Sequence, residues 1–93
     1  MKSRATRRFW QSFSDLPASV QSLARKNYQL WLNDQQHPSL HFKKLKGGGN
    51  RFSVRIGNHY RAIGHLVGDT VEWVWIGTHE NYNKLIGWLW PSS

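Results

Sequence analysis

The feature that most constrains the fold is a change in apolar spacing on either side of Pro38. Between residues 20 and 31, apolar side chains recur at the spacing of one helix face. Between residues 52 and 56 they alternate with polar ones, as on a half-buried strand. A chain that keeps these two periods in separate stretches favours an α+β fold.

Two helices are expected before this change. The first covers residues 4–13, where Phe9 and Phe13 lie on one apolar face. The second begins near Pro17, because the missing N–H of proline has no intrahelical acceptor in a first turn, and it continues to Trp31. Both helices are therefore amphipathic and need a sheet face to cover.

An antiparallel meander is expected after the change, with turns rich in glycine and asparagine. The two helices would cover one face of this small sheet and leave the other partly open. A short C-terminal helix or ordered tail follows between Thr78 and Trp90. The strands are expected at residues 42–46, 52–56, 60–67 and 70–76, and the inward side chains of the tail are Leu85, Ile86, Leu89 and Trp88.

The composition fits one compact domain spanning residues 1–93. No linker-like segment or internal repeat interrupts the 93 residues, and a chain of this length buries one modest core. Cysteine is absent, which predicts no disulfide framework and favours the cytoplasm. No apolar run has the length of a signal peptide or membrane span, so we expect no membrane association.

The charge of the chain indicates a class of partner. A formal net charge of +8 comes from 13 Lys and Arg against 5 Asp and Glu. Such a surplus indicates a polyanionic or an acidic protein partner, with nucleic acid as the leading candidate. The alternative is that the basic surface only keeps the domain in solution.

Turn lengths predict which side chains share a face of the sheet. A three-residue turn at residues 57–59 pairs Arg55 with Arg61 and puts them on one face with His65. A two-residue turn at residues 68–69 predicts three facing pairs, namely His65 with Glu72, Ile63 with Val74 and Arg61 with Ile76. The opposite, core face then carries Val54, Ile56, Tyr60, Ala62, Leu66, Val71, Trp73 and Trp75.

The predicted pair of arginines places two like charges directly opposite each other. Such a pair is unfavourable unless an anion lies between the guanidinium groups, and a phosphate meets that requirement. The alternative is that Arg55 or Arg61 pairs with Glu72 or Glu80. A two-residue turn at residues 57–58 would instead place the arginines on opposite faces.

Two further candidates follow the last strand at a chain reversal. The imidazole of His79 can transfer protons near neutral pH, and the phenol of Tyr82 can donate a hydrogen bond or stack on a base. The alternatives are a solvated loop histidine and a tyrosine packed on the core.

A basic cluster near the first strand is expected to contact phosphates without reading sequence. For its lysines, the alternative is protection of an edge strand against aggregation. The cluster consists of Lys43, Lys44, Lys46 and Arg51. We expect neither a metal nor a cofactor, because His37 and His41 straddle Pro38 in a loop without a nearby carboxylate.

Three segments together resemble a known family. They read HPSLHFKKLKG, RFSVRIGNHYRAIGHL and DTVEWVWIGTHENYNKL, and they follow two helices. Their order and spacing are similar to those of the RelE/ParE superfamily of bacterial toxins, nearest to its HigB-like branch, over residues 9–86.

The resemblance implies the toxin of a type II toxin–antitoxin system, neutralised by a cognate antitoxin. It implies a ribosome-dependent endoribonuclease that cuts mRNA and thereby inhibits translation. Arg61 matches the family's strand arginine that holds the scissile phosphate, and Arg55 a basic residue on the neighbouring strand. His79 and Tyr82 match its C-terminal proton-transfer and stacking positions.

Two other functions stay open at this point. The same scaffold carries toxins that are not nucleases and inhibit DNA gyrase, for which surface residues such as Arg25 and Lys26 would matter more than His79. A non-toxic nucleic-acid-binding module is the third reading, and it predicts binding that depends steeply on salt.

Overall fold

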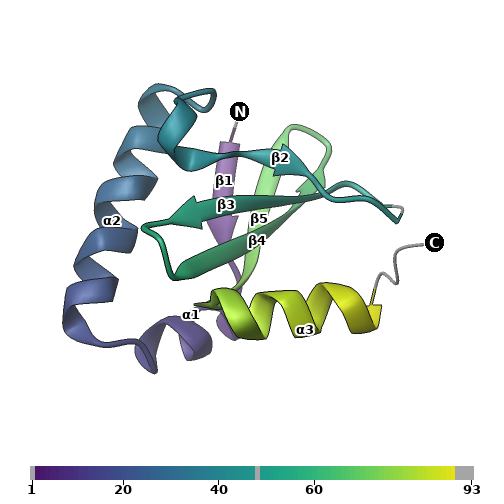
Figure 1. The fold of residues 1–93 in the computed structure, drawn as a ribbon. Coiled ribbons are helices and arrows are strands. Elements are labelled where there is room, and N and C mark those ends of the chain that lie inside the picture. Colours follow the sequence, from purple (N-terminus) through teal and green to yellow (C-terminus); the bar gives the residue numbers. More distant parts are fainter. Residues whose placement is uncertain (1, 48, 90–93) are drawn as a thin grey trace.

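The computed structural model describes residues 2–47 and 49–89, apart from the side chains of residues 88 and 89. It shows an α+β fold with one five-stranded sheet in the order β1-β5-β4-β3-β2 (Figure 1). The strands are β1 (Lys2–Ala5), β2 (Lys43–Lys44), β3 (Arg51–Ile56), β4 (Tyr60–Val67) and β5 (Thr70–Thr78). The helices are α1 (Arg7–Ser14), α2 (Ala18–Asn33), the 3₁₀ turn η1 (Pro38–Leu40) and α3 (His79–Leu89).

The N-terminal edge of the sheet differs from the prediction. Residues 2–5 form β1, which pairs in parallel with β5, so the sheet is mixed and the first helix begins at Arg7 instead of Arg4. Thr6 connects β1 to α1. Its backbone N–H donates to the Trp73 carbonyl at 3.0 Å, and its Oγ1 accepts from the Phe9 N–H at 3.2 Å as a helix cap. Pairing with a distant strand thus overrides the local helical spacing.

The remaining elements lie close to their expected places. The second helix begins directly after Pro17, as predicted, and β4 covers the predicted residues. The first predicted strand is shorter than expected, because β2 comprises Lys43–Lys44 alone. The glycine turn at 47–50 includes residue 48, which lies outside the described residues.

The main core lies between the sheet and the helices α1 and α2. Trp31 of α2 is 1% exposed, and its ring makes edge contacts with Trp73 and Phe42 at centroid distances of 5.3 and 5.7 Å. Burying each large apolar side chain contributes about 1.5–3 kcal/mol. The buried members of the cluster are Phe13, Ala24, Trp31, Leu40, Val54, Ile56, Ala62, Val71, Trp73 and Ile76.

A β-bulge in β5 changes the predicted faces. Gly64 pairs with Trp73 and Ile63 with Trp75, so Val74 is an extra residue without a partner on β4. The pairing of His65 with Glu72 is confirmed, whereas the predicted pairs of Ile63 with Val74 and Arg61 with Ile76 are wrong. Trp75 consequently shares the face of Ile63, away from the main core, and Ile76 takes the predicted core position.

The second face of the sheet is covered in part by α3, and Figure 1 shows this helix in front of the sheet with α1 behind it. Ser53 and Ile63 are cross-strand partners on this face and are buried, as is Tyr82 of α3. The second face is thus covered over this stretch, in keeping with the expectation of a partly open face. The predicted C-terminal helix is present and its Leu85 and Ile86 are half-buried, while the predicted contributions of Leu89 and Trp88 lie outside the described side chains.

Candidate active site

The predicted pair of arginines is present on the second face of the sheet. Arg55 of β3 lies directly opposite Arg61 of β4, because the turn between them has three residues. The Arg55 Nε donates to the Gly57 carbonyl at 3.0 Å, and its Nη2 donates to Asn58 Oδ1. The hairpin turn itself therefore holds the Arg55 guanidinium in place.

Neither arginine takes the acidic partner considered from the sequence. Arg61 donates from Nη1 to the Tyr60 carbonyl at 2.8 Å. Glu72 pairs with Arg4 of β1 at 2.6 Å instead. Within residues 2–47 and 49–89, no carboxylate forms an ion pair with Arg55 or Arg61. The like charges thus face each other without a carboxylate between them, which favours binding of an anion.

The surroundings of Arg61 disfavour its positive charge. Burial lowers the pKa of the Arg61 guanidinium, the charge of Arg55 lowers it further, and the nearby Tyr82 acts in the opposite direction. The group is still a cation at neutral pH, because the ordinary arginine pKa is far above 7. A bound phosphate would offset both unfavourable effects.

The start of α3 brings His79 and Tyr82 to the same end of the sheet. The backbone N–H of His79 donates to the His59 carbonyl at 2.7 Å, which ties the helix start to the turn between β3 and β4. Thr78 Oγ1 accepts from the Asn81 N–H at 3.1 Å and caps the helix. The rings of His79 and Tyr82 stack, with centroids 6.2 Å apart and planes 21° apart.

The two stacked rings differ in accessibility. Tyr82 is 6% exposed, so its ring packs in the interior, as in the core-packing alternative, whereas His79 is exposed. The imidazole is therefore accessible to a substrate. The buried Tyr82 ring packs against the imidazole of His79. It also lies close enough to Arg61 to raise the pKa of that guanidinium.

Two further histidines lie near this site, and neither was proposed as a catalytic residue from the sequence. His59 lines a small hollow of about 320 Å³ together with Tyr60, Thr78, His79 and Glu80. Its position in the turn directly before Tyr60 is the signal that could have identified it. His41 has its Nε2 at 3.5 Å from Arg55 Nη1 and a left-handed backbone with φ of 45°. No sequence signal predicts that contact, because it depends on η1 folding back towards β3.

The basic cluster predicted to contact RNA is divided by the register of β2. Lys43 pairs with Ser53 and shares the face of Arg55, whereas its neighbour Lys44 pairs with Phe52 on the opposite face. Arg51 pairs with His65 and also lies on the arginine face. Lys46 follows the strand and is exposed. A common surface of all three lysines is therefore not formed.

The described residues offer neither a metal centre nor a membrane-spanning helix. In residues 2–47 and 49–89, no cluster of three or more His, Asp or Glu side chains is placed to hold a metal ion. Over the same part of the chain, no helix combines the length and hydropathy needed to span a membrane.

The fold is shared with solved toxin structures. A solved structure of the RelB-RelE antitoxin-toxin complex from Methanococcus jannaschii contains a similar chain, with 20% identity and a TM-score of 0.70 over 87% of this chain and 95% of that chain. The YoeB/ParE toxin from Agrobacterium tumefaciens gives 19% identity and a TM-score of 0.66 over 85% and 99%. The isolated E. coli RelE toxin gives 15% and 0.63 over 95% and 97%. At these identities the likeness shows a shared fold.

The family follows from the sequence match. A family model described as a ParE-like toxin domain matches residues 18–84. The chain therefore belongs to the family of ParE-like toxin domains. A search of the curated proteins found no match.

Proposed function

We propose that this chain is the toxin of a type II toxin–antitoxin system, formed by a single domain over residues 1–93, and that it acts in the cytoplasm as a ribosome-dependent mRNA endoribonuclease of the HigB-like branch. The observation that carries the proposal is the opposed pair Arg55 and Arg61 beside the exposed His79. The partners would be a cognate antitoxin, as in the RelB-RelE complex, and the ribosome with its mRNA.

The proposed reaction uses the side chains of Arg55, Arg61 and His79. The 2′-hydroxyl of the RNA loses a proton and attacks the adjacent phosphorus, and the bond to the 5′-oxygen of the next nucleotide breaks. The products are a 2′,3′-cyclic phosphate and a 5′-hydroxyl that takes up one proton. Arg61 and Arg55 would stabilise the additional negative charge on the phosphate oxygens, and His79 would accept the proton of the 2′-hydroxyl and pass it to the departing 5′-oxygen. The arginines supply the required cations, so the proposal includes no metal or cofactor.

Tyr82, Lys43, Lys44, Lys46 and Arg51 have supporting roles in this proposal. Because Tyr82 is buried against His79, we assign it the orientation of the imidazole in place of stacking on a base. Arg51 and Lys43, which share the arginine face, would contact the RNA backbone away from the cleaved bond. Lys44 and Lys46 would add electrostatic attraction to the RNA phosphates, which does not require a fixed geometry.

The test is a pulse of expression followed by primer extension on bulk mRNA. The wild-type chain should arrest growth and produce new mRNA ends, whereas Arg61→Ala and His79→Ala chains that remain folded should lose about 10²–10³-fold of the cleavage rate. Arg8→Ala is the matched control, because Arg8 is exposed on α1. Intact mRNA during growth arrest would contradict the proposal.

A gyrase inhibitor is the second candidate, favoured by the match to a ParE-like domain. In that case arrest should be accompanied by trapped gyrase and a DNA-damage response. His79→Ala should then have little effect, while changes at the exposed Arg25 and Lys26 of α2 should relieve the arrest.

A further inference from the structure

The reaction proposed above moves a proton between two oxygens that lie apart. The attacking 2′-oxygen and the departing 5′-oxygen lie roughly in line, on opposite sides of the phosphorus. A proton is therefore removed on one side of the phosphate and supplied on the other. A second proton-transfer group on the far side would spare His79 the movement from one oxygen to the other.

His41 lies on the opposite side of the arginine pair from His79. In the sheet order β1-β5-β4-β3-β2, the strands that carry Arg61 and Arg55 are the neighbours β4 and β3. His79 follows β5, on the β4 side of this pair, whereas His41 comes shortly before β2, on the β3 side. Figure 1 shows β3 and β4 between β2 and α3 in its view. A phosphate held by the two arginines would thus have one imidazole on each side.

The contact of His41 with Arg55 defines which ring nitrogen can take a proton. His41 Nε2 lies 3.5 Å from Arg55 Nη1. A guanidinium only donates hydrogen bonds, so Nε2 is the acceptor in this contact and carries a lone pair. At 3.5 Å the contact is long for a hydrogen bond, and a hydroxyl that comes closer can replace it. The nitrogen that faces the arginine is therefore suited to accept a proton from the substrate.

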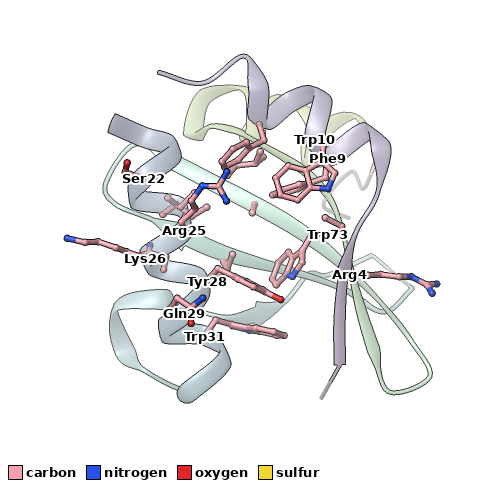
Figure 2. A pocket seen from close by; sticks show the side chains of 18 residues that line it. Arg4, Phe9, Trp10, Ser22, Arg25, Lys26, Tyr28, Gln29, Trp31 and Trp73 are labelled. Atoms are coloured by element: carbon pink, nitrogen blue, oxygen red, sulfur yellow. The ribbon is translucent and has the colours of Figure 1, made fainter. Parts of the chain in front are cut away.

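The neighbours of His41 in the chain hold its exposed imidazole in a defined place. Leu40 is 0% exposed and belongs to the main core. The Phe42 ring stacks on Phe52 at a centroid distance of 5.1 Å. Phe42 also meets the ring of Trp31, which projects from α2 in Figure 2. Both flanking residues are thus fixed in the interior, as is required for a side chain that must keep a productive geometry.

The backbone conformation of His41 also sets it apart. Its φ of 45° and ψ of 44° lie in the left-handed region. Among residues 2–47 and 49–89 it is the one residue other than glycine with a positive φ. Glycine or asparagine is the usual choice for this conformation at the end of a helical turn, and other residues that adopt it cluster at functional sites. An ionisable side chain thus occupies a position that the backbone alone would assign to glycine.

We propose that His41 is a second catalytic residue, which removes the proton of the 2′-hydroxyl while His79 supplies the proton of the 5′-oxygen. The inference rests on the function proposed above and divides between two residues the transfers given there to His79. The 2′-hydroxyl proton moves to His41 Nε2, and the 2′-oxygen forms its bond to phosphorus. The bond from phosphorus to the 5′-oxygen breaks, and His79 donates a proton to that oxygen. Exchange with water then returns both imidazoles to their starting states.

The first experiment measures the pH dependence of the cleavage rate, with the full chain and ribosomes programmed with an mRNA that contains the cleaved site. Two residues that begin in opposite protonation states give a bell-shaped profile, whereas one histidine that begins neutral gives a single rise to a plateau. His41→Asn should lower the rate about 10²-fold and remove the rise on the acidic side. His79→Ala should remove the fall on the basic side. A single rise that persists in His41→Asn would overturn the proposal.

The variants are chosen so that loss of folding is not mistaken for loss of catalysis. Asparagine tolerates the left-handed backbone, so His41→Asn should keep the wild-type melting temperature. His37→Asn is the matched control, because His37 belongs to the same loop. Its side chain accepts from the Ser39 N–H at 3.2 Å, a cap that asparagine can also provide. The control should change the rate by less than about threefold. Equal losses for the two variants would contradict the role of His41.

A second experiment separates proton removal from proton donation. It uses the same mRNA with sulfur in place of the bridging 5′-oxygen at the cleaved bond. A thiolate leaves without being protonated, because thiols are far more acidic than alcohols. His79→Ala should therefore cleave this mRNA within about tenfold of the wild-type rate, whereas His41→Asn should stay about 10²-fold slower. Recovery of His41→Asn instead of His79→Ala would reverse the two roles and overturn the assignment.

Failure of the proposed function gives a different pattern. Wild-type chain that leaves the mRNA on programmed ribosomes intact would remove the nuclease and the role of His41 together. Wild-type cleavage that His41→Asn leaves unchanged in rate and pH profile would remove only the role of His41. The proposed function would then stand with His79 as its single proton-transfer residue.

Discussion

The two faces of the sheet use the same strands for different purposes. On the face towards α1 and α2, alternate residues such as Val54 and Ala62 are apolar and buried. On the other face, the neighbouring residues Arg55 and Arg61 carry like charges that oppose each other. Strand side chains alternate between the two faces. Adjacent residues of one strand therefore serve different roles, one in the core and the next in the candidate active site. Substitutions one position apart should therefore have different consequences.

The largest effect is expected for Trp31→Ala, which tests whether stability resides on the α1/α2 face. The side chain is 1% exposed and contacts three aromatic rings. Its removal should lower the free energy of unfolding by about 3–5 kcal/mol, measured by urea denaturation. Leu32→Ala on the same helix, with a 48% exposed side chain, should change it by less than about 1 kcal/mol. Similar losses for both variants would contradict this view of the core.

An intermediate effect is expected for Gly64→Ala. A Cβ at Gly64 would lie 2.7 Å from Val71 Cγ1 and 3.0 Å from the Trp73 ring. This overpacking should cost about 1–3 kcal/mol, seen as a lower melting temperature. Gly87→Ala in α3 is the control, because among the described residues a Cβ there meets no atom within 4 Å outside its own stretch of helix, and it should stabilise the helix by about 0.5–1 kcal/mol. An unchanged melting temperature for Gly64→Ala would mean that the core face is loosely packed there.

A smaller loss of stability is expected for Thr78→Ala, at the junction of β5 and α3. Thr78→Ala removes the oxygen that accepts from the Asn81 N–H at the start of α3. The loss should be about 1 kcal/mol, with faster hydrogen exchange confined to the first turn of α3. Thr78→Ser keeps the acceptor and should retain the wild-type exchange rates. Exchange that increases along all of α1 and α2 as well would show that the two faces are not independent.

The smallest effect on stability is expected for Arg61→Gln, the variant that should separate stability from activity. It removes the repulsion with Arg55 and one partly buried charge, so the free energy of unfolding should stay within about 0.5 kcal/mol of wild type or rise slightly. Added salt should stabilise the wild-type chain more than the variant, because it screens that repulsion. A strong loss of stability would show that Arg61 has a structural role.

The sequence predicted the arginine pair because its evidence is local. Turn length alone fixes which residue of β4 lies opposite Arg55, and alternation then fixes the faces. The helix α2 was predictable for the same reason, since its apolar spacing and the preceding proline are adjacent in the chain.

The features that the sequence did not predict depend on distant contacts. β1 exists because residues 2–5 pair with β5, about seventy positions away. The bulge at Val74 is hidden because every residue from Trp73 to Ile76 is apolar and suits either face. The position of His41 near Arg55 and the burial of Tyr82 likewise depend on how η1 and α3 pack on the sheet.

The bulge at Val74 acts as a one-residue phase shift between the two halves of β5. Upstream of it, odd-numbered residues such as Val71 and Trp73 face the main core; downstream, the even-numbered Ile76 does. Deletion of Val74 would restore one regular alternation of side chains along β5. Each residue after the deletion would then point to the opposite face of the sheet. The chain would then leave the sheet with the opposite orientation, directing the start of α3 towards α1. The extra residue Val74 thus determines on which face of the sheet α3 packs.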